Sequence, residues 1–255
     1  MAEYRIPKEK RNTLITLSLL LLFWTSETKM SAQSTTKKLF YKTYVNREMY
    51  KWGDLIRSVE TNNPPKTIEQ KFELLNYYYG FTGYLMNRKQ HETAQIYISK
   101  GQDLIDNILD IAPKNPTAYS YKGAFYGFQM GLSKYKSVYL GPKCLVEIHK
   151  ALKIDQNNIQ ALVDKGNVYF YSPAVLGGDK EDALQLYIRA LNLMERNKET
   201  DHNWNYLNLL TTIGIGYTKT AKLNEAKKIY EKILKIEPDF KWVKDDLYPN
   251  LIKKM

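Results

Sequence analysis

One short helical block recurs four times along the chain, and it restricts the fold more than any other feature. The blocks are centred on Leu109, Leu152, Leu191 and Leu234, at intervals of 43, 39 and 43 residues. A period between about 20 and 50 residues is typical of arrays in which each repeat buries its apolar face against a neighbour. Helical spacing of apolar residues dominates from about Lys37 onward, without sustained strand-like alternation. The sequence therefore predicts an all-α array of helical repeats.

The best-formed copy is the segment 207–240, which predicts two short helices folded against each other. Gly214 lies on the first helix, Ala226 and Tyr230 lie on the second, and Pro238 closes the unit. Small residues let two helices approach, and large residues fill the space that remains. This pattern resembles a tetratricopeptide repeat (TPR) of about 34 residues. The resemblance implies a right-handed α-solenoid of antiparallel helix pairs, with roughly nine to ten helices.

Three further units precede this copy, at 159–206, 116–158 and the more divergent 67–115. In the unit 159–206, Gly166 and Ala183 match the small positions, and Ser172 to Leu176 forms an insertion. In the unit 116–158 the extra residues fall near 132–140, and Cys144 occupies a position where alanine is usual. An N-terminal capping helix at 33–66 and a capping segment at 241–255 are expected, because terminal repeats otherwise expose their apolar faces.

The first 32 residues have the composition of a secretory signal. A basic leader precedes the apolar run 13–24, which is too short to span a bilayer. Cleavage near Ala32 is predicted, and the mature protein is expected in the periplasm of a Gram-negative-type bacterium or outside the cell. The alternative is that this segment is not cleaved and anchors the protein. We expect association with a membrane only in that case.

The net charge of +11 is compatible with acidic partners, but its distribution argues against nucleic acid. The positive residues occur singly or in pairs such as Lys227-Lys228, without a basic tract. Export also disfavours a nucleic-acid partner. We therefore interpret the excess as a solvated basic surface.

No arrangement of residues predicts catalysis, a metal or a cofactor. Cys144 is the only cysteine, and His149 lies five residues away, which places the two side chains on different faces of a helix. A nucleophile needs a base within hydrogen-bond reach, and none is predicted here. The sequence therefore indicates a protein that is not an enzyme.

In TPR arrays the first helix of each unit lines the concave face. The side chains of this helix that are not used for packing are therefore candidate binding residues. Tyrosine offers contact area together with a hydrogen-bonding hydroxyl. Charge reversal at Asp164 and Asn167 is expected to weaken partner binding without unfolding the array. The predicted groove residues are Thr117, Ser120, Tyr121, Gln160, Asp164, Asn167, Asn208 and Thr211.

The insertion in the unit 159–206 contains the loop residues Pro173, Gly177, Gly178 and Asp179. The glycines favour a turn, and Asp179 is expected to accept hydrogen bonds from the first backbone amides of the next helix. The block from Pro173 to Asp179 is also similar to a loop in the TPR component associated with TRAP-type periplasmic transporters. Two interpretations remain open, a contribution to partner choice and a stiff insertion packed over its own repeat.

These observations predict an exported, non-catalytic module that binds a protein or peptide on its concave face. The alternative is a periplasmic component of a TRAP-type transporter that handles a small organic ligand. A buried cavity lined by arginine or lysine would favour the transporter component. A shallow polar groove would favour the binding module.

Overall fold

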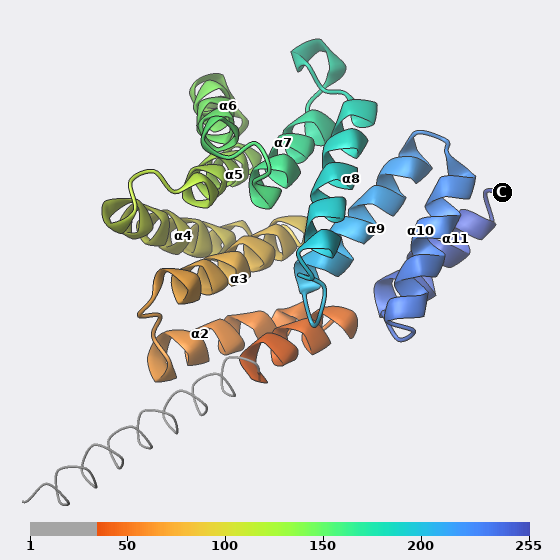
Figure 1. Ribbon diagram of the computed structural model, residues 1–255, viewed down its shortest axis with the longest axis horizontal. Coiled ribbons are helices and arrows are strands. Elements are labelled where there is room, and N and C mark those ends of the chain that lie inside the picture. Colours follow the sequence, from red (N-terminus) through yellow and green to blue (C-terminus); the bar gives the residue numbers. More distant parts are fainter. Residues whose placement is uncertain (1–34) are drawn as a thin grey trace, which may run out of the picture.

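The computed structural model describes residues 35–255 (Figure 1). The predicted signal peptide at 1–32 lies outside these residues. Within them the chain is helical without a strand, and the prediction of an all-α array of paired helices is confirmed. After a helical stretch at 35–45, the α-helices are α2 (Trp52–Asn62), α3 (Ile68–Asn87), α4 (His91–Ile111), α5 (Pro116–Leu132), α6 (Ser137–Ile154), α7 (Ile159–Tyr171), α8 (Lys180–Arg196), α9 (Trp204–Lys219), α10 (Leu223–Ile236) and α11 (Tyr248–Ile252).

The helix starts follow from short polar residues at the N-caps. The side chains of Asn115, Asn158 and Asn203 accept hydrogen bonds from backbone amides at the starts of α5, α7 and α9. Thr67 and Gln70 form a reciprocal capping box at the start of α3. Each cap satisfies amides that have no partner inside the helix. The first helices of the four predicted units thus share one kind of start signal.

Successive helices pack as antiparallel pairs, α3 with α4, α5 with α6, α7 with α8, and α9 with α10. The glycine positions explain the closeness of two of these pairs. A methyl group at Gly214 would lie 2.3 Å from the ring of Tyr230, and one at Gly166 would lie 2.5 Å from the ring of Tyr187. Glycine on the first helix and tyrosine on the second therefore form the predicted small-and-large packing.

The N-terminal cap differs from the single helix expected at 33–66. The first helical stretch ends at residue 45, a 3₁₀ turn spans Met49–Lys51, and α2 begins at Trp52. Arg47 adopts a positive φ of 60°, which a continuing right-handed helix does not permit. The Trp52 indole donates a 2.8 Å hydrogen bond to Thr43 Oγ1 and so fixes the bend.

The same N-terminal stretch reaches the last unit of the array. The Tyr44 ring lies 5.2 Å from the Phe240 ring, and its hydroxyl donates to Asn208 Oδ1 on α9 at 3.1 Å. Arg47 forms a 2.6 Å ion pair with Asp246. Figure 1 shows this red segment beside α2 and below α9. The two ends of the described chain are therefore in contact, and the array closes on itself at this point.

The expected insertion at 132–140 is shorter than predicted. Only residues 133–136 separate α5 from α6, and part of this connection is a 3₁₀ turn. Residues 137–140 belong to α6, whose first turns precede Pro142. Pro142 is the sixth residue of α6 and stands inside the helix, so the helix lacks the backbone hydrogen bond that an amide at this position would donate. The extra length of this unit therefore extends a helix instead of a loop.

Beyond α10 the chain forms a π-helical turn at Trp242–Leu247 and the short helix α11. Val243 and Leu251 are buried, and both elements contact α10. They therefore cover the outer face of the last helix pair. Among residues 35–255, no helix is both long enough and apolar enough to cross a membrane.

Candidate functional site

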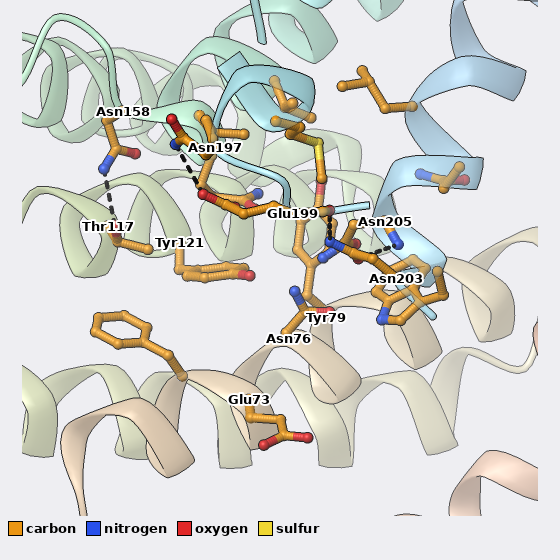
Figure 2. A pocket seen from close by; sticks show the side chains of 18 of the residues that line it. Glu73, Asn76, Tyr79, Thr117, Tyr121, Asn158, Asn197, Glu199, Asn203 and Asn205 are labelled. Atoms are coloured by element: carbon orange, nitrogen blue, oxygen red, sulfur yellow. Dashed lines mark hydrogen bonds between the residues drawn. The ribbon is translucent and has the colours of Figure 1, made fainter. Parts of the chain in front are cut away.

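A cleft with a volume of about 1010 Å³ lies on the inner side of the array (Figure 2). It receives side chains from α3, α5, α7 and α9, from the connection between α8 and α9, and from Lys37 and Lys38 of the N-terminal stretch. The first helices of all four units thus contribute to one cavity. The N-terminal stretch contributes to it because it folds back against the last unit.

A hydrogen-bonded network, which we call the floor network, joins α3, α5, α7 and α8 beneath the cleft. Asp164 Oδ2 accepts from Ser120 Oγ at 2.6 Å, and Asp164 Oδ1 accepts from the Tyr79 hydroxyl at 3.1 Å. Asn167 Nδ2 donates to the Tyr79 oxygen at 3.1 Å, and Asn167 Oδ1 accepts from the Tyr187 hydroxyl at 2.8 Å. Tyr79 thus connects the first unit directly to the third.

Asp164 is the unusual member of the floor network because it is an acid with only 2% of its surface exposed. Burial raises the pKa of its carboxyl to about 7, although hydrogen bonds from Ser120, Gln160 and Tyr79 favour the ionised form and lower it. These partners are all uncharged. The carboxyl is therefore held by neutral donors, and it changes its charge near neutral pH.

The walls of the cleft are rich in side-chain amides. They comprise eight asparagines and one glutamine, namely Asn76, Asn157, Asn158, Gln160, Asn167, Asn197, Asn203, Asn205 and Asn208. Several of them already hold the protein together; for example, Asn158 donates to Thr117 and Asn203 caps α9. Asn76 differs, because its Oδ1 atom is buried without a hydrogen-bond partner among the described residues. An unpaired buried acceptor is costly, so Asn76 is the amide of the lining with unused hydrogen-bonding capacity.

The charges on the cleft are opposite in sign to the charge of the whole chain. Five carboxylates line it, those of Glu69, Glu73, Asp155, Glu199 and Asp201, against the two lysines Lys37 and Lys38. The chain as a whole carries +11. Asp201 Oδ1 lies 2.8 Å from His202 Nδ1. An acidic lining attracts cationic groups and disfavours anions.

The predicted groove residues divide into two sets. Five of them line the cleft, namely Thr117, Tyr121, Gln160, Asn167 and Asn208. Ser120, Asp164 and Thr211 do not line the cleft, and their side chains are buried. Ser120 and Asp164 bond to each other, and the Thr211 hydroxyl donates to the Leu207 carbonyl at 2.7 Å. In this closed array, the first helices of neighbouring units pack against positions that a more open groove would leave free.

The structure adds residues that sequence reasoning did not select. Phe72, Asn76 and Tyr79 come from α3, which belongs to the most divergent unit, and Asn197 to Asn205 come from a connection between units. Figure 2 shows Asn76, Tyr79 and Tyr121 grouped on one side of the cleft, across from Asn203 and Asn205. The cluster Tyr77-Tyr78-Tyr79 was the available signal, because three adjacent tyrosines cannot all face one side of a helix.

The loop residues Pro173, Gly177, Gly178 and Asp179 lie outside the cleft lining. Gly177 has a φ of 82°, and a methyl group at Gly178 would lie 1.9 Å from the Ser172 carbonyl oxygen. Asp179 Oδ1 accepts from the amides of Glu181 and Asp182 at 2.8 and 3.0 Å, which confirms its predicted capping role. Val175 and Leu176 are exposed, so the loop does not pack over its own repeat.

The described residues contain no group of histidine, cysteine, aspartate and glutamate side chains that could hold a metal ion. Cys144 is buried, and burial, with a smaller effect of Asp164, raises the pKa of its thiol to about 12. A thiol that stays protonated is a poor nucleophile. Cys144 thus fills the packing position that was predicted for it.

Comparison of the sequence with protein-family models gives no match, and comparison with curated proteins gives none either. Solved structures with a similar arrangement include a thermophilic TPR protein of Thermus thermophilus, with 15% identity and a TM-score of 0.49, covering 87% of this chain and 95% of that one. They also include PilF of Pseudomonas aeruginosa, with 18% identity and a TM-score of 0.41, covering 72% and 71%. The helix pairing and glycine–tyrosine contacts described above define this chain as a TPR-like helical protein.

Proposed function

We propose that the protein is a non-catalytic binding module that holds an extended, positively charged segment of a partner protein in the cleft. The observation that carries this proposal is the lining of the cleft, in which amides and carboxylates surround the rings of Phe72, Tyr79 and Tyr121. Side-chain amides offer a donor and an acceptor together, which matches the hydrogen-bonding groups of a peptide unit. Aromatic side chains add contact area at a low cost in conformational entropy.

The residues with unused hydrogen-bonding capacity give the binding mode more detail. Asn76 Oδ1 has no partner in the described part of the chain, and Asn205 lies across from it at the start of α9. We propose that these two amides contact the backbone of the bound segment, while Glu69 and Asp155 attract its basic side chains. The remaining amides, such as Asn158 and Asn203, keep the walls in place through their own hydrogen bonds.

The acidic lining gives less support to the transporter component. A site for an organic anion needs an excess of cations, whereas only Lys37 and Lys38 oppose the five carboxylates at this cleft. Export to the periplasm or the outside of the cell, with cleavage near Ala32, remains part of the proposal. The expected partner is therefore an exported protein with a basic, extended segment.

A peptide array tests the binding function directly. The labelled full chain is applied to ten-residue peptides whose net charge increases from negative to positive. We expect binding to rise with positive charge, and we expect Asn76→Leu with Asn205→Leu to weaken it by about tenfold or more, since two buried hydrogen bonds are lost. Asn224→Leu, at an exposed position on α10 outside the cleft, is the matched control. Binding that ignores peptide charge, or that survives the double substitution, would exclude the cleft.

A further inference from the structure

The turn between α5 and α6 exposes three large side chains close together. Tyr135 is 93% exposed, Val138 is 84% exposed and Tyr139 is 53% exposed. Single exposed apolar residues are ordinary, but three within five positions form a patch that a soluble surface usually avoids. The adjacent Leu140 is only 3% exposed, so the helix itself is anchored in the core.

The turn and the start of α6 carry only positive charges. Lysines lie there at positions 134, 136 and 143, and the sequence has no acidic residue between positions 133 and 146. Lys122, farther back on α5, is paired with Asp106 at 3.0 Å and is not part of this charge. The neighbouring turn between α3 and α4 adds Arg88 and Lys89, both exposed. The two turns are close in space, because a methyl group at Gly131 would lie 2.7 Å from the Met86 side chain. Counting basic tracts along the sequence misses this feature, because the positive residues of the two turns are not adjacent in sequence; Glu92, in the first turn of α4, is an exposed acid beside them.

The next turn along the array, between α7 and α8, exposes a second apolar tip. Tyr171, Val175 and Leu176 are 72%, 92% and 75% exposed. This connection projects beyond the ends of its helices in Figure 1. Its shape is fixed, because the Pro173 carbonyl accepts from the amides of Leu176 and Gly178 at 2.9 and 3.1 Å. Successive turns of the same kind lie along the same edge of a repeat array.

We propose that this edge, made of residues 88–89, 135–143 and 171–176, docks onto the surface of an anionic lipid membrane. Tyrosine suits the headgroup level because its ring is apolar and its hydroxyl is polar. Valine and leucine at fixed tips enter the boundary of the acyl chains, and lysine and arginine pair with lipid phosphates. The acid-lined cleft is repelled by the same surface, so the charge pattern also orients the molecule with this edge toward the membrane.

This docking is independent of the apolar run 13–24, and the experiment separates the two. Full-length protein is sedimented with vesicles of phosphatidylcholine alone and with vesicles that contain about 30% phosphatidylglycerol. Contact through the N-terminal segment also responds to lipid charge, because a basic leader precedes the apolar run, so the edge variants described below, in the same full-length chain, separate the two contacts. We expect partitioning to rise about tenfold with the anionic lipid and to fall as salt is raised, because the attraction is screened.

Two variants assign that increase to the edge. Replacing Tyr135, Val138 and Tyr139 by serine, or Lys136 and Lys143 by glutamate, is expected to remove most of the tenfold gain. The matched controls are Tyr50→Ser with Ile96→Ser, which are also exposed apolar residues, and Lys227→Glu with Lys228→Glu on α10. Circular dichroism confirms that each variant is folded. Equal partitioning into both kinds of vesicle would overturn the proposal. Edge variants that bind the anionic vesicles as strongly as the control variants would overturn it too.

Discussion

The floor network and the edge at the α5–α6 turn use opposite kinds of side chain in opposite environments. In the floor network, a carboxylate and two hydroxyls are buried and bond to one another, so polar residues serve the fold. At the edge, tyrosine and valine side chains are exposed to solvent and are not part of the core. The difference shows that residue type alone does not separate binding positions from structural ones in this array. Burial and bonding partners make that distinction, and the following substitutions test it.

The largest effect is expected for Asp164→Lys. An ammonium group at this position would be buried among Ser120, Gln160 and Tyr79, which are uncharged and cannot balance its charge. We expect a loss of about 3 to 5 kcal/mol in the free energy of unfolding, since an unpaired buried charge is strongly destabilising. Urea denaturation measures the loss, and Gln185→Lys, at an exposed position on α8, is the control. Equal stability of the two variants would mean that position 164 is open to solvent. A loss of that size would contradict the expectation, drawn from the sequence, that charge reversal at Asp164 leaves the array folded.

A smaller effect is expected from pH, and its sign follows from the raised pKa of Asp164. The folded protein holds a proton up to about pH 7, whereas the unfolded chain releases it near the ordinary value of about 4. Stability from this group is therefore present at acidic pH and decreases as pH rises between these values, by up to a few kcal/mol. Urea denaturation at pH 5 and pH 8 should show this decrease, and Asp164→Asn should abolish it. A slope that persists in Asp164→Asn would assign the titration to another group.

Tyr79→Phe tests the bond between the first and third units. The substitution keeps the ring but removes the hydroxyl that donates to Asp164 and accepts from Asn167. We expect a loss of about 1 to 3 kcal/mol, because one buried donor remains unpaired. Tyr119→Phe is the control, since its hydroxyl bonds only to an exposed backbone carbonyl. A Tyr79→Phe variant as stable as this control would show that the two units are held together by other contacts.

The sequence predicts the local features of this fold well, because these depend on residues close together along the chain. Gly214 against Tyr230 and the Asp179 cap are examples. The sequence does not predict how tightly the array curves, and this curvature decides the candidate site. It brings Tyr79 to Asp164, 85 residues away, and it brings Tyr44 to Asn208, 164 residues away. Ser120 and Asp164 therefore occupy the first helices, as expected, but face each other instead of the open cleft.

The smallest effect on stability is expected at the edge. Replacing Tyr135, Val138 and Tyr139 by serine removes side chains that are mostly in water, so the free energy of unfolding should change by no more than about 0.5 kcal/mol per site. Leu140→Ala, in the same helical turn but buried, should cost about 2 to 5 kcal/mol. Thermal and urea denaturation of both variants measure the contrast. A destabilised serine variant would mean that these side chains are covered in solution by another part of the protein or by a second copy, and a surface that is already covered cannot dock onto lipid.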